Sequence, residues 1–143
     1  MVRRVVLACL AFSSVACGDS IAGPEDIAGK YTLLSIDGEL PAVTSEIGAP
    51  VLVQVTAGSM TLDADLIFSF TLELRQTENG AVSTDTVTTL GTFTFMDPQG
   101  AFTSNPGGDL TLTSLANQVV LTGEIDGSQL FLQDEEHLFV FQK

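Results

Sequence analysis

The sequence predicts an all-β protein, an antiparallel up-and-down meander of about 8 to 10 strands closed into a small barrel. The segment Phe68–Arg75 alternates strictly between apolar and polar residues, as a strand with one buried and one wet face does. Asn79-Gly80 and Asp126-Gly127 lie between β-rich runs and suit tight hairpin turns. No helical crossover separates these runs. A two-sheet β-sandwich remains the alternative, because alternation alone does not show whether a sheet closes.

Each expected strand is a short run rich in Thr, Val, Leu or Phe and bounded by turn residues. In chain order these runs are Tyr31–Ile36, Val51–Thr56, Met60–Leu62, Phe68–Arg75, Val87–Met96, Leu110–Leu115, Val119–Ile125 and Leu138–Phe141. The further connections are expected at Ala57-Gly58, Asp63–Asp65, Asp97–Gly100, Pro106–Gly108 and Asp134–Glu136. The segment Asp37–Pro50 contains few strand formers and is long enough to be a lid or a crossover loop.

The first residues of the chain indicate export. Arg3 and Arg4 precede an apolar run, Val5–Phe12, and small residues follow up to Ala16, which is the pattern of a secretory signal peptide. Val5 to Ala16 is only 12 residues long. That is too short to cross a bilayer, which takes roughly 20 residues.

Cys17 directly follows Val15 and Ala16, and this site resembles a bacterial lipobox, although Ser14 stands where Leu, Val or Ile is usual. The resemblance implies that Cys17 is acylated and becomes the first mature residue. Gly18 after the cysteine favours the outer membrane over the inner one. The alternative is an ordinary signal peptide cut after Ala16, which leaves a free thiol.

We therefore expect three parts: a lipoprotein signal peptide (residues 1–16), an acylated cysteine with a flexible tether (17–28), and one barrel domain (29–143). Of the two cysteines, Cys9 leaves with the signal peptide, so no internal disulfide is expected. The formal net charge is −13. Such a surface repels nucleic acid and anionic lipid head groups, which makes both poor partners.

Two segments carry a family resemblance. Gly29-Lys30-Tyr31-Thr32-Leu33 is similar to the first strand of bacterial lipocalin-like domains, and Leu138–Lys143 is similar to their short aromatic last strand. The resemblance implies that Tyr31 closes the barrel floor and that Lys143 packs on it. Tyr replaces the usual Trp, and Lys replaces the usual Arg, which stacks better on a ring.

The apolar faces of the expected strands suggest an interior ligand site. Phe68 and Phe70 on one run, and Phe93 and Phe95 on another, are each spaced two residues apart on one face. They are able to line a cavity for a small apolar molecule. The alternative is a filled core, which every small barrel needs. The complete set of interior positions is Tyr31, Phe68, Phe70, Leu72, Phe93 and Phe95.

Catalytic and metal chemistry have little support. His137 is the only histidine, no Gly-x-Ser-x-Gly elbow is present, and we expect His137 to be an exposed turn residue. One histidine without a spare cysteine does not supply a zinc site. The acidic turns Asp63–Asp65 and Asp134–Glu136 match no calcium-loop pattern. We expect no enzyme, metal or cofactor, but a lipid-anchored envelope protein that binds a small hydrophobic ligand or acts as a structural and interaction module with a filled barrel. Its protein partner is unknown.

Overall fold

The computed structural model describes residues 23–45, 48–96, 107–116 and 120–143. The expected signal peptide, Cys17 and the expected turn at Asp97–Gly100 lie outside these residues. The described elements, in chain order, are α1 (Pro24–Ile27), β1 (Gly29–Ile36), β2 (Ala42–Val43), β3 (Val51–Leu62), β4 (Ile67–Glu78), β5 (Ala81–Met96), β6 (Gly107–Ser114), β7 (Val120–Asp126), β8 (Gln129–Gln133) and β9 (Leu138–Gln142).

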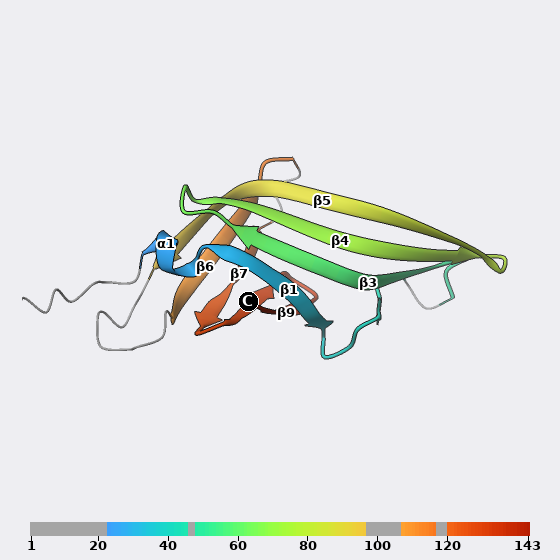
Figure 1. Cartoon of the computed structure of the whole chain (residues 1–143). Coiled ribbons are helices and arrows are strands. Elements are labelled where there is room, and N and C mark those ends of the chain that lie inside the picture. Colours follow the sequence, from blue (N-terminus) through green and yellow to red (C-terminus); the bar gives the residue numbers. More distant parts are fainter. Residues whose placement is uncertain (1–22, 46–47, 97–106, 117–119) are drawn as a thin grey trace, which may run out of the picture.

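The strands form one antiparallel sheet that closes on itself (Figure 1). From β3 to β9 each strand pairs with the next one in the chain. β1 pairs with β9 on one side and with β3 on the other, from Gly29 opposite Leu62 to Thr32 opposite Ser59. β1 and β3 to β9 therefore make a closed barrel of eight strands. The predicted meander barrel is confirmed, and closure excludes the sandwich.

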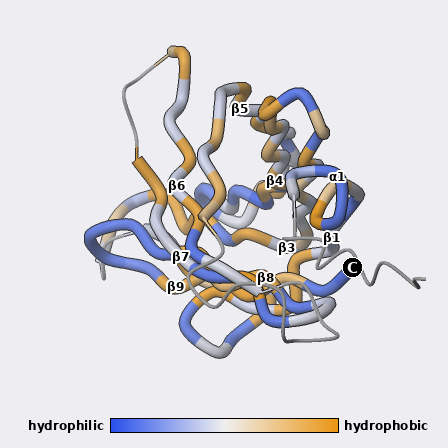
Figure 2. Tube along the Cα trace, turned by 90° about the vertical axis from the view of Figure 1, so that its left-hand side faces the viewer, coloured by the Kyte–Doolittle hydropathy of each residue, from blue (hydrophilic) through white to orange (hydrophobic). Residues whose placement is uncertain are grey.

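Alternating burial builds the core. In β6 the side chains of Leu110 and Leu112 are buried between exposed Asp109 and Thr113, so one face of the strand points inward. The same alternation of apolar and polar residues is visible along the strands in Figure 2. The buried apolar side chains form one contiguous cluster inside the barrel.

The helix α1 lies at the end of the barrel where β1 begins (Figure 1). Its first residue is Pro24, and the Asp26 carboxylate accepts a 2.8 Å hydrogen bond from the Gly23 N–H, two features that favour a helix start. The Ile27 side chain is fully buried. Pro24–Ile27, within the segment expected to be a tether, thus packs on the barrel. No helix of the described residues is long and apolar enough to cross a membrane.

Three strands run on beyond the barrel. The pairing of β1 with β3 stops at Ser59, and the pairing of β5 with β6 starts at Gly91. We call the part outside these limits, residues 51–58 of β3, 72–78 of β4 and 81–90 of β5, the projecting ribbon (Figure 1). The hairpin turn at its tip is Asn79-Gly80, with φ values of 50° and 82°, as predicted.

The predicted strand limits were wrong in the ribbon. Val51–Thr56 and Met60–Leu62 are one strand, β3, and the pairing shifts by one residue between Val55 and Ala57 instead of turning at Ala57-Gly58. This β-bulge breaks the alternation that marks a single strand. β5 starts at Ala81 instead of Val87, because a segment exposed on both faces carries no apolar alternation.

Other connections also differ from expectation. Within Asp37–Pro50 the chain forms β2, which pairs with β3 and buries Ala42. Gly107 and Gly108 belong to β6 and not to a turn. A side chain at Gly108 would overlap the Met96 carbonyl oxygen and the Phe95 ring, so this position of the strand requires glycine.

Candidate functional site

The six side chains predicted to line a ligand site all join the same core. Tyr31, Phe68 and Phe93 are at most 2% exposed, and Phe70 is 9% exposed. The two others, Leu72 and Phe95, are partly buried and pack against this cluster. The structure therefore brings the predicted set together inside the barrel wall.

Phe70 is the centre of an aromatic cluster that crosses the barrel. Its ring lies edge-on to Phe139 and Phe141, with centroid distances of 5.7 and 5.8 Å. Both partners come from β9, which is separated from β4 around the barrel by β3 and β1. The rings thus meet across the interior in the geometry that aromatic pairs prefer.

Two other predicted side chains lie over glycines of the wall. A side chain at Gly91 would overlap the Phe68 ring and the Thr113 carbonyl oxygen. A side chain at Gly108 would lie 2.6 Å from the Phe95 ring. Each glycine leaves room for an aromatic ring from the strand beside it, so these rings fill the space next to the wall.

The floor of the barrel contains the contact that the lipocalin-like resemblance implies. The Lys143 Nζ atom lies 5.7 Å from the centroid of the Tyr31 ring, a cation–π distance. The Tyr31 hydroxyl donates a 2.6 Å hydrogen bond to the carbonyl oxygen of Ile27 in α1. Burial raises the pKa of Tyr31 to about 12. Tyr31 and Lys143 thus join the helix, the first strand and the end of the last strand.

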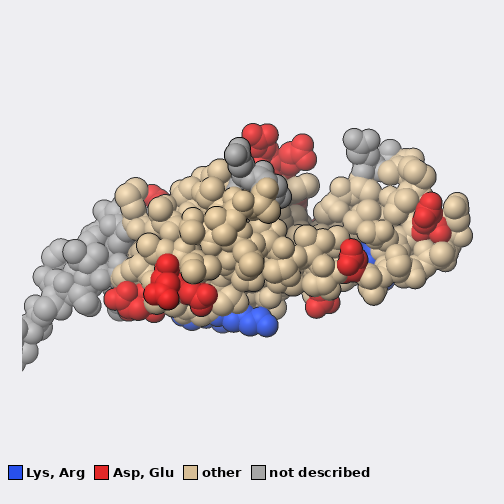
Figure 3. Space-filling model, turned by 90° about the horizontal axis from the view of Figure 1, so that it is seen from above, with Lys and Arg blue, Asp and Glu red and all other residues tan. Residues whose placement is uncertain are grey.

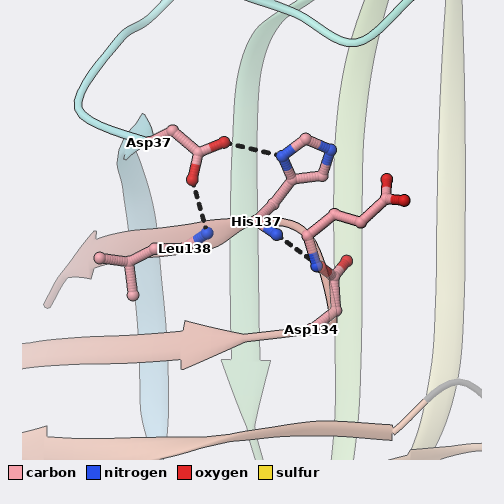
Figure 4. Close-up of polar contacts among 5 residues, drawn as sticks. Asp37, Asp134, His137 and Leu138 are labelled. Atoms are coloured by element: carbon pink, nitrogen blue, oxygen red, sulfur yellow. Dashed lines mark hydrogen bonds and ion pairs between the residues drawn. The ribbon is translucent and has the colours of Figure 1, made fainter.

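The opposite end of the barrel carries a polar cluster (Figure 4). The Asp37 carboxylate lies 2.7 Å from the Nδ1 atom of His137 and accepts a 2.8 Å hydrogen bond from the Leu138 N–H. The Asp134 carboxylate accepts the N–H groups of Glu136 and His137, at 2.8 and 2.7 Å, and so closes its own turn. The cluster fastens the end of β1 to the start of β9.

These contacts shift two pKa values in opposite directions. The hydrogen bond from Leu138, followed by the one from His137, lowers the pKa of Asp37. The hydrogen bond to Asp37 raises the pKa of His137 above its ordinary value. The sequence predicts that His137 lies exposed in a turn; its side chain is one-third exposed and has a charged partner 100 residues away. No local pattern indicates that pairing.

An open hollow of about 430 Å³ lies on the outer wall over β6 to β9. Its lining residues are Asp109, Thr122, Gly123, Glu124, Phe131, Gln133 and Leu138. Asp109 and Glu124 are direct cross-strand neighbours, and Phe131 is the next residue across. Sequence reasoning missed this hollow because its residues come from separate strands.

The described residues contain no group of three or more His, Cys, Asp or Glu side chains placed to hold a metal ion. Comparison of the chain with protein-family models, with curated proteins and with solved structures gave no match.

Proposed function

We propose that this chain is an exported, lipid-anchored protein of the bacterial cell envelope, and that its lipocalin-like barrel is a non-catalytic structural and interaction module. The observation that carries the proposal is the aromatic cluster in which Phe70 meets Phe139 and Phe141 across the interior. Rings that fill the barrel leave its outer surface and the ribbon for contact with partners.

The anchor is tested by the cysteine that would carry it. We expect wild-type protein in the outer-membrane fraction of its host, and we expect Cys17→Ala to release it from membranes. Stable anchoring needs more than one acyl chain, so loss of the acylated residue removes the attachment. Cys9→Ala is the matched control and keeps the membrane location. A Cys17→Ala protein that stays in the membrane fraction contradicts the anchor.

The filled interior is tested by ligand content. The protein is isolated from its host without denaturation and analysed by native mass spectrometry, then titrated with a fluorescent fatty acid. We expect the mass of the acylated chain alone and no saturable fluorescence change. A copurified lipid in stoichiometric amount, displaced by the fatty acid, contradicts the filled barrel.

A second candidate function is binding of a small hydrophobic ligand, and one observation favours it. Leu72 and Leu74 continue the inward face of β4 from the barrel into the ribbon and are only partly buried, and Val87 opposite Leu72 is 45% exposed. This apolar strip is able to hold an acyl chain at the end of the barrel from which the ribbon projects. Saturable fatty-acid binding that Val87→Asp abolishes supports this function, and equal binding by both proteins rejects it.

A further inference from the structure

One side of β5 is unpaired over most of the ribbon. β4 pairs with β5 from Ala81 to Thr92, whereas β6 pairs with it only from Gly91 onward. Along Ala81–Thr89, β4 is therefore the only neighbouring strand among the described residues. These nine residues present about 30 Å of open strand edge.

Two hydrogen bonds show which backbone groups face this edge. The Phe93 N–H bonds to the Leu66 carbonyl oxygen on the β4 side, and the Leu90 carbonyl oxygen accepts the Leu115 N–H on the β6 side. Successive residues of a strand point their backbone groups to opposite sides. The N–H and C=O groups of the even-numbered residues therefore point to the open edge. These residues are Val82, Thr84, Thr86 and Thr88.

The edge is exposed to solvent and has few of the residues that usually prevent an edge strand from pairing with another strand. Every residue from Ala81 to Thr88 is exposed, and Val82 is 63% exposed. Natural edge strands are commonly shielded by Lys or Pro, and Ala81–Leu90 contains neither. Its one charged residue is Asp85, whose Oδ1 atom accepts a 2.8 Å hydrogen bond from the Thr86 N–H. One edge amide is thus occupied by a side chain that a docking strand is able to displace.

Most of the charges beside the edge are negative. Glu73 and Glu78 lie on β4, next to β5, and Asp85 lies on β5 itself. Arg75 is directly opposite Thr84 in register, but its guanidinium donates to Gln54 on β3, at 3.2 and 2.5 Å, away from β5. Figure 3 shows acidic side chains on the ribbon end of the molecule as well as on the barrel.

We propose that the open edge of β5, Val82–Thr88, docks an extended basic segment of another protein by strand addition. Backbone hydrogen bonds along the edge hold the segment, and Lys or Arg side chains complement Asp85 and the acidic residues of β4. A second copy of this chain fits less well, because each copy has a net charge of −13 and brings its own Asp85 to the contact. This inference rests on the proposed interaction module and specifies its partner.

The test uses the mature chain, from residue 17, with Cys17→Ser and two synthetic peptides. The probe is Lys-Thr-Val-Thr-Lys-Val-Thr-Lys-Val, and the control has Glu in place of each Lys. We expect saturable binding of the basic peptide, at least about tenfold tighter than the acidic one. In NMR spectra the amides of Val82, Thr84 and Thr88 gain protection from hydrogen exchange when the basic peptide binds.

Thr84→Pro removes one edge N–H and leaves the pairing with β4 intact, because this N–H faces outward. We expect it to weaken peptide binding at least tenfold, whereas Thr84→Val keeps the N–H and the affinity. If Thr84→Pro unfolds the ribbon, Asp85→Lys serves as the test instead. Because this substitution reverses the charge at the edge, it should weaken binding of the basic peptide and strengthen binding of the acidic peptide.

Three results overturn the inference. The first is no saturable binding at millimolar concentrations of the basic peptide. The second is peptide binding that neither Thr84→Pro nor Asp85→Lys changes. The third is a dimer in sedimentation experiments that Thr84→Pro abolishes, because that result would assign the edge to a second copy of this chain. Any of them leaves the anchor and the filled barrel standing, because Cys17→Ala and the lipid analysis test those separately.

Discussion

Substitution of Phe70 tests whether the barrel interior is filled with side chains or encloses a ligand cavity. It is 9% exposed, and its ring contacts Phe139 and Phe141 across the interior. Phe70→Ala therefore removes a ring from a packed core, which typically costs about 3–5 kcal/mol in the free energy of unfolding. Each edge-to-face aromatic contact contributes a further ~0.5–1.5 kcal/mol beyond its buried area, so we expect a loss near the upper end.

The measurement is urea unfolding of the mature Cys17→Ser chain, followed by far-ultraviolet circular dichroism. Thr92→Ala, an exposed position on β5, is the matched control and should change the free energy by less than about 0.5 kcal/mol. If Phe70 lined an existing ligand cavity, its loss would cost only the transfer of its ring, about 1.5–3 kcal/mol. A measured loss below about 3 kcal/mol refutes the filled interior.

Three further predictions follow from the two ends and the wall of the barrel. Tyr31→Phe removes a buried hydrogen bond to α1 and should lower the free energy of unfolding in urea by about 1 kcal/mol. Because the pKa of Tyr31 is raised to about 12, its phenolate should appear in ultraviolet spectra of the folded protein only well above pH 10. The raised pKa of His137 contributes stability that is fully present below the ordinary imidazole pKa and is lost as pH rises through the raised pKa. The lowered pKa of Asp37 contributes stability that is present above the ordinary carboxyl pKa and is lost as pH falls through the lowered pKa. NMR titration should therefore give His137 a midpoint above 6.5 that Asp37→Asn lowers, and an unchanged midpoint rejects the pair. Gly91→Ala places a methyl group against the Thr113 carbonyl oxygen and the Phe68 ring and should cost about 1–3 kcal/mol in the same urea assay, and a neutral result contradicts those contacts.

The strands that were predicted from the sequence are those with one buried apolar face and one exposed polar face. Phe68–Arg75 alternates because one face of β4 is in the core, and the alternation was enough to place the strand. Asn79-Gly80 marked its turn because both residues adopt positive φ. The contact between Lys143 and the Tyr31 ring was also expected, from the resemblance of the two ends of the barrel to a known family.

The short strand β8, Gln129–Gln133, was not predicted, and the other features that sequence reasoning missed depend on long-range contacts. The start of β5, from Ala81 to Thr86, is exposed on both faces, and its pairing with β4 alone makes it a strand. β3 continues through a bulge that breaks its pattern. Asp37 and His137 are 100 residues apart and meet only because β1 and β9 are neighbours in the closed sheet. These features require the topology and not the local sequence.

The most direct test of the filled barrel is a set of NMR cross-peaks between aromatic rings. With centroids 5.7 and 5.8 Å apart, the Phe70 ring protons should give nuclear Overhauser effects to Phe139 and Phe141 in the ligand-free protein. We expect the same cross-peaks after addition of excess fatty acid. Their absence, or their loss when fatty acid is added, would mean that the rings part to admit a ligand, and would contradict a solid interior.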